Sequence, residues 1–408
     1  MDKKLTQYAK LIIKQGVNLV PGETVAIACP VNAAELAETI AEEAYKAGAS
    51  EVVTFWNDAK ISKLAYEYES VESLTSIPDY VVASRDYILE KKGVYISVIS
   101  TLPGLLKDVD ASKVAAASRA SSKALHRFRE STGINATRWC LVAYPNESWA
   151  KKMFPDLSAK DALEKQWEYM HKTLRLDKED YLGAWKEHQE NLARRSKFLN
   201  EAKIKKFHYK NSIGTDFTIG MPKGYIFTGA VEKSQGGVDF TANLPTEEVF
   251  SSPDMNTAEG TLVAALPLVR NGAIIKNFSI TLEKGRIVDY KAEEGYETLK
   301  EIIETDEGSH RLGEIALIGF DSPIQNLRAL FWETLFDENA SCHFAIGRGF
   351  PTCLEGGADM TKEQLAAAGV NDSLQHVDFM VGTKDLDITA TTESGEEIAV
   401  FRGGNWVI

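Results

Sequence analysis

The sequence has little of what marks secreted and membrane-spanning proteins. Only four cysteines occur in 408 residues, and no two of them form a CxxC pair. They are Cys29, Cys140, Cys342 and Cys353. Such sparse, scattered thiols cannot cross-link a chain of this length and indicate a reducing compartment. No uncharged apolar run approaches the ~18 residues that cross a bilayer, and the first residues lack the apolar core of a signal peptide. We therefore expect a cytoplasmic protein that does not enter a membrane.

Positive charge is also in short supply. Lys and Arg number 46 against 59 Asp and Glu, which gives a net charge of −13. An acidic balance repels phosphate backbones and anionic lipid surfaces at long range, so nucleic acid is not an expected partner.

Several common catalytic motifs are absent. The chain has no GxxxxGK[ST] phosphate loop, no HExxH and no GxSxG. The segment Gly347–Gly349 is only a fragment of GxGxxG, because Thr352 stands at the third glycine position. These absences argue against a nucleotide-dependent enzyme.

The residues that are present describe a folded protein of about two domains. Hydrophobic residues make up 44% and charged residues 26%, as in ordinary globular chains. In the first half, apolar segments typical of strands alternate with segments of helical periodicity. We predict strands at 23–29, 51–56, 94–100 and 137–144, and helices at 5–17, 34–47 and 112–129. This alternation favours an α/β domain with a mostly parallel sheet.

The second half has a different pattern of predicted helices and strands. Residues 147–206 are almost continuously helical in pattern and are predicted to form a connector. Beyond Phe207 short strands and turns dominate, with helices predicted at 295–304, 324–336 and 361–368. We therefore predict two domains: an N-terminal α/β domain with its helical connector, residues 1–205, and a β-rich α+β C-terminal metal-binding domain, residues 206–408.

Histidines beside carboxylates point to the chemistry of the second domain. In HVDFMVG the period of a strand places His376 and Asp378 on one face. His343 follows the acids Asp337 and Glu338 by a few residues. Two simpler explanations stay open, a local hydrogen-bonded pair for His376 and Asp378, and a satisfied core residue for His343. The other histidines considered, which lie on charged helical stretches, are expected at the surface: His126, His171, His188 and His208.

Further carboxylates stand close to apolar strands. TEEVF carries Glu247 and Glu248, and Glu314 directly precedes IALIG. Burying an unpaired anion costs several kcal/mol, so a cation is expected near each inward-facing acid. Four carboxylates with two imidazoles suit two divalent ions, which activate water for amide hydrolysis.

At these residues the chain resembles the metallo-aminopeptidases of the M29 family, the group of PepS, AmpS and aminopeptidase T. The resemblance rests on NLPTEEVFSSPD (243–254), GEIALIG (313–319), LFDENASCHFAIG (335–347) and HVDFMVG (376–382). It extends to NLVPGETVAI near the start and FRGGNW at the end.

The resemblance implies a set of metal ligands, two divalent ions (Zn²⁺ or Co²⁺, with Mn²⁺ also tolerated) and a cytoplasmic homodimer. The implied ligands are Glu248 rather than Glu247, Glu314 as the bridging carboxylate, and Glu338, His343, His376 and Asp378. Glu338 and His376 act either as direct ligands or by supporting the ligands. The implied substrates are short peptides with a free N-terminus, from which the first residue is removed. Glu247 is a candidate for proton transfer, although adjacent strand residues face opposite ways.

One position departs from the family. Phe350 stands where the family usually has a Tyr whose hydroxyl faces the metals, and loss of such a donor costs ~2.7–4 kcal/mol of transition-state stabilisation. Arg348 either replaces that donor or lies at the surface, and the metals alone are a further source of electrophilic help. Phe350 also motivates an alternative function, a metal- and peptide-binding homologue with impaired catalysis. A third possibility is a cysteine hydrolase that uses Cys342 or Cys353 with His376.

Overall fold

A computed structural model describes residues 3–270 and 273–408. The chain forms two compact units, and neither is a continuous stretch of sequence. Unit 1 comprises Met1–Lys186 and Val231–Pro245, and unit 2 comprises Glu187–Ala230 and Thr246–Ile408. The predicted domain boundary at residue 205 stays a prediction, because a compact unit is not by itself a domain that folds alone.

Unit 1 is built on a parallel sheet of five strands in the order β2-β1-β3-β4-β9. The strands are β1 (Thr24–Pro30), β2 (Glu51–Asn57), β3 (Val94–Ile99), β4 (Trp139–Ala143) and β9 (Asn243–Leu244). The four strands predicted in the first half are confirmed, as is the α/β class. A hairpin of β7 (Glu232–Lys233) and β8 (Asp239–Phe240) also belongs to this unit.

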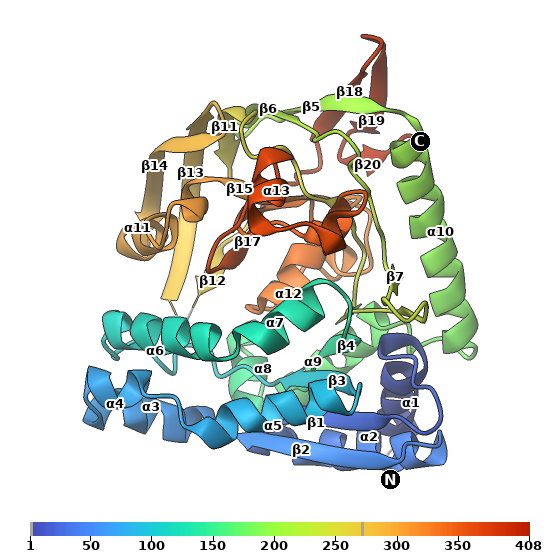
Figure 1. The fold of residues 1–408 in the computed structure, drawn as a ribbon, viewed down its shortest axis with the longest axis vertical. Helices are drawn as coiled ribbons and strands as arrows, with labels where there is room; N and C mark the ends of the chain where they lie inside the picture. The colour runs from blue at the N-terminus through green and yellow to red at the C-terminus, as the bar shows by residue number, and fades with distance from the viewer. Residues whose placement is uncertain (1–2, 271–272) are drawn as a thin grey trace. The chain divides into compact units, whose positions relative to one another are not determined.

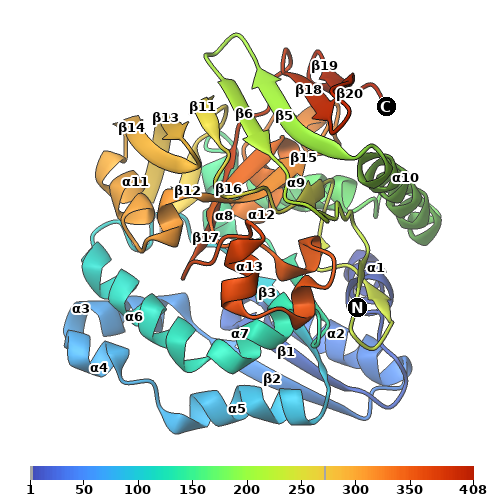
Figure 2. The same cartoon turned by 45° about the horizontal axis from the view of Figure 1, so that its top comes forward.

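Helices cover both faces of this sheet, as parallel strands require. On one face α1 (Lys3–Leu11), a π-helical turn (Ile12–Gly16) and α2 (Ala34–Lys46) pack on alternate strand residues, including Val25, Ile27 and Ile96. On the other face lie α5 (Asp79–Glu90) and α7 (His126–Gly133), where Phe128 meets Tyr95 edge-on at 4.8 Å. Figure 2 shows α5 and α7 in front of β1 and β2.

The predicted helices of this part are confirmed in their main lines. The segment 112–129 forms α6 (Ala111–Ala124) and the start of α7, and the connector forms α8 (Glu147–Met153), α9 (Ala159–Thr173) and α10 (Tyr181–Glu201). Sequence reasoning missed α3 (Ala59–Tyr68), α4 (Val71–Thr75) and α5. The helices α3 and α4 have no buried residue and α5 buries only Ile88, and the apolar residues that α3 carries at helical spacing, Ile61, Leu64 and Tyr68, are exposed.

Unit 2 contains two antiparallel sheets (Figure 1). The larger has nine strands in the order β12-β13-β11-β6-β5-β18-β19-β20, with β14 paired to β13. Its strands are β5 (Ile204–Lys210), β6 (Asp216–Gly220), β11 (Glu259–Val263), β12 (Leu268–Arg270), β13 (Ala273–Glu283), β14 (Arg286–Glu294), β18 (Asp387–Thr392), β19 (Glu397–Arg402) and β20 (Asn405–Trp406). The smaller has the order β10-β15-β16-β17 and comprises β10 (Val249–Ser251), β15 (Leu312–Leu317), β16 (His343–Gly347) and β17 (His376–Met380).

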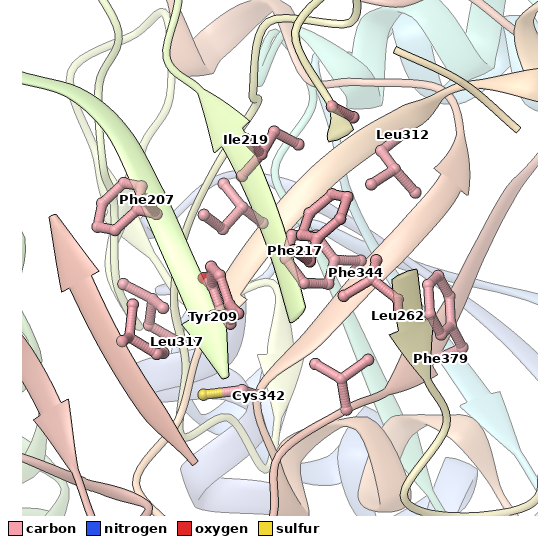
Figure 3. Close-up of a cluster of buried hydrophobic side chains, with 14 of the residues drawn as sticks. Phe207, Tyr209, Phe217, Ile219, Leu262, Leu312, Leu317, Cys342, Phe344 and Phe379 are labelled. Atoms are coloured by element: carbon pink, nitrogen blue, oxygen red, sulfur yellow. The ribbon is translucent and has the colours of Figure 1, made fainter. Parts of the chain in front are cut away.

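The core of unit 2 lies between these sheets. Figure 3 shows aromatic and aliphatic side chains of both sheets in one cluster. The Phe344 ring lies 5.1 Å from the ring of Tyr209 and 5.3 Å from that of Phe217, and Phe379 lies 5.7 Å from Phe278. Full burial of such a side chain contributes roughly 1.5–3 kcal/mol, so the inner face of the small sheet is held firmly.

Two of the three helices predicted here are confirmed, and one is wrong. The segments 295–304 and 361–368 form α11 (Tyr296–Ile303) and α13 (Lys362–Ala367). Residues 324–336 form only a 3₁₀ turn (Gln325–Leu327) and the start of the short α12 (Thr334–Asp337). The Asp337 carboxylate accepts hydrogen bonds from the Phe331 and Glu333 amides at 2.8 and 3.2 Å. A side chain that binds nearby backbone groups in this way competes with the helix.

In the part of the chain that the structure describes, no helix combines the length and apolar character needed to span a bilayer.

Candidate metal centre

Strand alternation separates the apolar and the charged faces of the small sheet. Ile315, Phe344 and Val377 point into the core between the sheets, whereas Glu314 and Asp378 belong to the opposite face. The two acids flank Ala345 from its two sides, since Ala345 pairs with Glu314 on β15 and with Asp378 on β17.

The two histidines follow the same rule. His343 pairs with Ala316 on the neighbouring strand, and His376 pairs with Gly347. Small residues therefore stand opposite the charged ones, and they leave space above the sheet for long polar side chains. Glu248, the residue directly before β10, adds its carboxylate to this face.

The structure brings five predicted ligands into two groups that share one carboxylate. In the first group His343 Nε2 lies 3.3 Å from Glu248 Oε2, and Glu314 is the third member. In the second, His376 Nε2 lies 2.9 Å from Glu314 Oε2 and 3.2 Å from Asp378 Oδ1. Within each group all candidate ligand atoms lie within 4.8 Å of one another.

Both imidazoles are held from behind by backbone carbonyls. His343 Nδ1 donates to the carbonyl of Glu338 at 2.9 Å, and His376 Nδ1 donates to that of Arg348 at 2.7 Å. A carbonyl oxygen can only accept, so each Nδ1 carries a proton and each Nε2 faces the carboxylates. This is the orientation that histidine ligands of metals adopt in proteins.

Burial and mutual repulsion shift the titration of the cluster. Burial raises the pKa of Glu314 to about 7, and it also raises the pKa of Glu338 well above its usual value, with the charge of Asp378 adding to the effect. Burial opposes the charged imidazole of His343, but the hydrogen-bonded Glu248 outweighs it and raises that pKa to about 10. For Asp378, burial is likewise outweighed, and the nearby His376 lowers its pKa.

These residues fit divalent cations. Four buried or nearly buried carboxyl groups lie beside two imidazoles, and the raised pKa values of Glu314 and Glu338 reflect burial and the negative charge gathered there. Asp378 Oδ1 is buried and faces His376 Nε2 at 3.2 Å. Bound cations would compensate the buried carboxylates, and oxygen and imidazole donors in this mixture suit zinc, cobalt or manganese.

Glu338 and Glu247 lie outside the two groups of candidate metal ligands. Glu338 is buried beside the cluster, but neither group of candidate ligand atoms includes it, so its role as a direct ligand stays a prediction. The Glu247 carboxylate lies 3.7 Å from His188 Nε2 and lines a small pocket that none of the six predicted ligands lines. Its role in proton transfer also stays a prediction.

Sequence reasoning missed two residues that hold this region. His188, expected at the surface, is largely buried and donates to the Thr246 carbonyl at 2.8 Å. His171, also predicted at the surface, is buried too. The side chains of His126 and His208 are exposed, as expected. Asn339 is fully buried and accepts a hydrogen bond from the Glu247 amide at 2.8 Å. Its only sequence signal is its place directly after Glu338.

Phe350 packs at the edge of the cluster. Its ring centre lies 4.9 Å from that of His376 and 5.4 Å from that of Phe250. The side chain thus lies beside His376, one of the metal ligands that the family resemblance implies. It brings no hydrogen-bond donor to this part of the cluster.

The structure argues against Cys342 as a nucleophile. Its thiol is buried in the core between the sheets and hydrogen-bonded to the Ile318 carbonyl at 3.2 Å, and burial raises its pKa to about 12. A thiol that stays protonated at neutral pH cannot attack a peptide bond.

Comparison with known proteins agrees with this geometry. A family model described as "Thermophilic metalloprotease (M29)" matches residues 1–406. Aminopeptidase 2 of Geobacillus stearothermophilus and aminopeptidase AmpS of Bacillus subtilis (strain 168) are each 40% identical over 99% of this chain and 98% of their own length. The solved structure of wild-type AmpT from Thermus thermophilus superposes with a TM-score of 0.91 at 31% identity, covering 100% of this chain and 99% of AmpT.

Proposed function

The chain belongs to the M29 family of metalloproteases, and from this premise we propose that it is a metal-dependent aminopeptidase that removes the N-terminal residue from short peptides. The observation that carries the proposal is the pair of three-residue groups joined by Glu314. A shared carboxylate between two sets of donors is the arrangement that a two-metal hydrolase needs.

We assign one ion to Glu248, Glu314 and His343 and the other to Glu314, His376 and Asp378. Bound divalent ions acidify a water molecule and polarise the peptide carbonyl. The protein orients its two imidazoles through their Nδ1 hydrogen bonds, and Glu314 serves both positions. Zinc or cobalt is the proposed metal, with manganese as a tolerated replacement.

The remaining residues have supporting roles in the proposal. Glu338 supplies the carbonyl that holds His343, and its carboxyl group is buried beside the proposed ligands. Glu247 is the proposed proton carrier. Phe350 shapes the edge of the site without a hydroxyl to stabilise developing negative charge.

Location and assembly complete the proposal. We place the enzyme in the cytoplasm, because its four cysteines are few and widely spaced. We propose that it is a homodimer, which light scattering in solution would detect as twice the 45.1 kDa chain mass. A mass of 45.1 kDa would contradict the dimer.

The alternative function, a metal- and peptide-binding homologue with impaired catalysis, rests on Phe350 alone. The curated relatives that match over nearly their whole length are named as aminopeptidases.

The test of function uses purified protein before chelation, after chelation and after zinc is restored. We expect release of the first residue from an unblocked dipeptide amide, abolished by the chelator and recovered with zinc. An N-acetylated copy of the dipeptide should not be cleaved. Full activity after chelation, or no release from the unblocked dipeptide at any stage, would overturn the proposal.

A further inference from the structure

Helix α3 of unit 1 turns its apolar side to the solvent. Ile61, Leu64 and Tyr68 recur at spacings of three and four residues, which places them in one stripe along the helix. Their exposed fractions are 66%, 51% and 83%. Lys63 and Tyr66 lie on the opposite side of the helix and are only partly exposed. A surface helix normally buries its apolar stripe, so α3 has the reverse orientation.

The orientation of α3 is held at both of its ends. At the start of the helix, the Asp58 carboxylate accepts a hydrogen bond from the Lys60 amide at 2.8 Å. At its end, Lys113 of α6 donates to the carbonyls of Tyr66 and Glu69 at 3.0 and 2.7 Å. Figures 1 and 2 show α3 beside α4 at the edge of unit 1. The outward-facing stripe is therefore a feature of the folded unit.

The stripe is large enough to form the centre of a protein interface. Its three side chains together present on the order of 300 Å² of apolar surface, since an aromatic side chain alone buries ~150–250 Å² when fully covered. Val71, the first residue of α4, is also exposed and follows the stripe closely in the chain. Apolar surface of this size with polar residues around it marks interaction sites on soluble proteins. The polar rim supplies the rest of the roughly 800 Å² that each partner buries in a stable interface.

The charged residues beside the stripe differ in sign between the two ends of α3. Lys60 and Glu67 are seven residues apart, so they border the stripe on the same side, the cation near the start and the anion near the end. Lys60 has no ion pair with any residue that the structure describes. Glu67 lies 3.6 Å from Lys63 of its own helix, and an exposed pair of this kind contributes little stability. Both charges thus remain available to a partner.

A helix with this pattern is complementary to a second copy of itself. Two copies that cross in antiparallel orientation about a twofold axis near Leu64 bring each end of one helix to the opposite end of the other. Ile61 then lies against Tyr68 of the partner subunit, and Lys60 lies beside the partner's Glu67. The apolar stripes cover each other, and each cation meets an anion. A parallel arrangement would instead bring like charges together, which is unfavourable.

We propose that the α3 stripe, formed by Ile61, Leu64 and Tyr68, is a contact surface between two copies of this chain, with their α3 helices antiparallel about a twofold axis. The inference rests on the homodimer that is part of the proposed function, and it names the surface through which the two copies meet. A second copy is favoured over an unrelated protein, because α3 carries both signs of charge in the order that its own copy requires. The stripe belongs to unit 1, and none of the proposed metal ligands is part of it.

Analytical ultracentrifugation of the full-length protein over a range of concentrations tests the surface. We expect wild type to show twice the 45.1 kDa chain mass. Leu64→Glu places two carboxylates together at the twofold axis, so it should raise the dissociation constant of the dimer at least about tenfold. Glutamate is a good helix former and position 64 is exposed, so the variant should fold. The control Ile213→Glu, at an exposed apolar residue between β5 and β6, should dimerise as wild type.

An exchange of charges tests the antiparallel arrangement. Lys60→Glu and Glu67→Lys should each weaken the dimer at least about threefold, because each brings like charges face to face. The double variant should dimerise as wild type, since both ion pairs form again with their signs exchanged. An anion near the start of α3 and a cation near its end agree with the helix dipole, so the helix is retained in every variant. Unchanged dimerisation in both single variants, or no recovery in the double variant, would overturn the proposed arrangement.

The outcomes separate this surface from the rest of the proposed function. A dimeric wild type together with an equally stable Leu64→Glu dimer would overturn the α3 surface and leave the homodimer in place. A wild-type mass of 45.1 kDa at every concentration would overturn both the homodimer and the α3 surface. The loss of peptidase activity after chelation tests the enzyme itself, and neither result affects it.

Discussion

Phe350 is the single residue with the most direct consequence for rate. Its ring centre lies 4.9 Å from that of His376, with the two rings tilted by 52°, and the ring offers no donor to a peptide carbonyl. We predict that Phe350→Tyr raises kcat by at least about tenfold, because an oxyanion donor contributes ~2.7–4 kcal/mol where it has been removed by mutation. Steady-state kinetics with an unblocked dipeptide amide measures the effect.

The control for this substitution adds a hydroxyl elsewhere. Phe198 is an exposed residue of α10, and Phe198→Tyr should leave kcat unchanged. A kcat of Phe350→Tyr that equals or falls below that of wild type would mean that the missing hydroxyl does not limit the reaction.

Asn339 has a positioning role. Its side chain accepts from the Glu247 amide at 2.8 Å and donates to the Leu335 carbonyl at 3.0 Å, so it ties the segment before β10 to α12. We predict that Asn339→Ala lowers metal affinity about 10–100-fold, as loss of a supporting hydrogen bond near a metal site does. Metal competition with a chromophoric chelator measures this, and the exposed Asn57→Ala serves as the control. Wild-type affinity in Asn339→Ala would remove Asn339 from the account.

The individual residues of the site could be predicted from sequence better than their supports. His376 and Asp378 share a face because a strand has a period of two, and Glu314 lies at a recognisable apolar strand. His188 and Asn339 each make a hydrogen bond to a backbone group far away in the sequence. No periodic pattern encodes such contacts, so only the folded chain reveals them.

At the scale of elements, Asp306 in the turn between α11 and β15 binds the segment that leads into β17. The Asp306 carboxylate accepts hydrogen bonds from the Ser309 amide at 2.8 Å, from the Ser373 hydroxyl at 2.8 Å and from the Leu374 amide at 2.6 Å. Burial raises the pKa of Asp306, but these donors outweigh it and lower the pKa below its usual value. The carboxylate therefore stabilises the folded state only while it is ionised.

The sign of this effect sets a pH dependence. A depressed pKa adds stability above the unfolded value of ~3.9 and loses it as the pH falls through the lower folded value. We predict that Asp306→Asn lowers the free energy of unfolding by about 1 kcal/mol at pH 7, allowing for its partial exposure. The difference from wild type should shrink below about pH 4. Thermal melts from pH 7 to pH 3 measure it, and a constant difference at all pH values would contradict the mechanism.

Elements were predictable where the apolar pattern was strong. The strands of unit 1 and the helices α11 and α13 follow periodicity. The predicted helix 324–336 is wrong because Asp337 binds the Phe331 and Glu333 amides, and Arg328 and Trp332 adopt positive φ values of 51° and 59°. Local side-chain bonds of this kind override an apolar pattern.

Over the whole molecule, the chain crosses between its two compact units more than once. Residues 231–245 return to unit 1, where the two-residue strand β9 pairs with β4. So short a strand carries no alternation for sequence analysis to detect. The candidate metal centre, by contrast, lies wholly in unit 2, and its proposed ligands come from four adjacent strands or their ends.

The central claim is that Glu314 serves two ions at once, and metal content measures it most directly. Elemental mass spectrometry on zinc-reconstituted protein should find two ions per chain in wild type. It should find one ion in Glu248→Gln, one in Asp378→Asn and fewer than one in Glu314→Gln, with each variant confirmed to be folded. Two tightly held ions in Glu314→Gln, or none in the reconstituted wild type, would contradict the account.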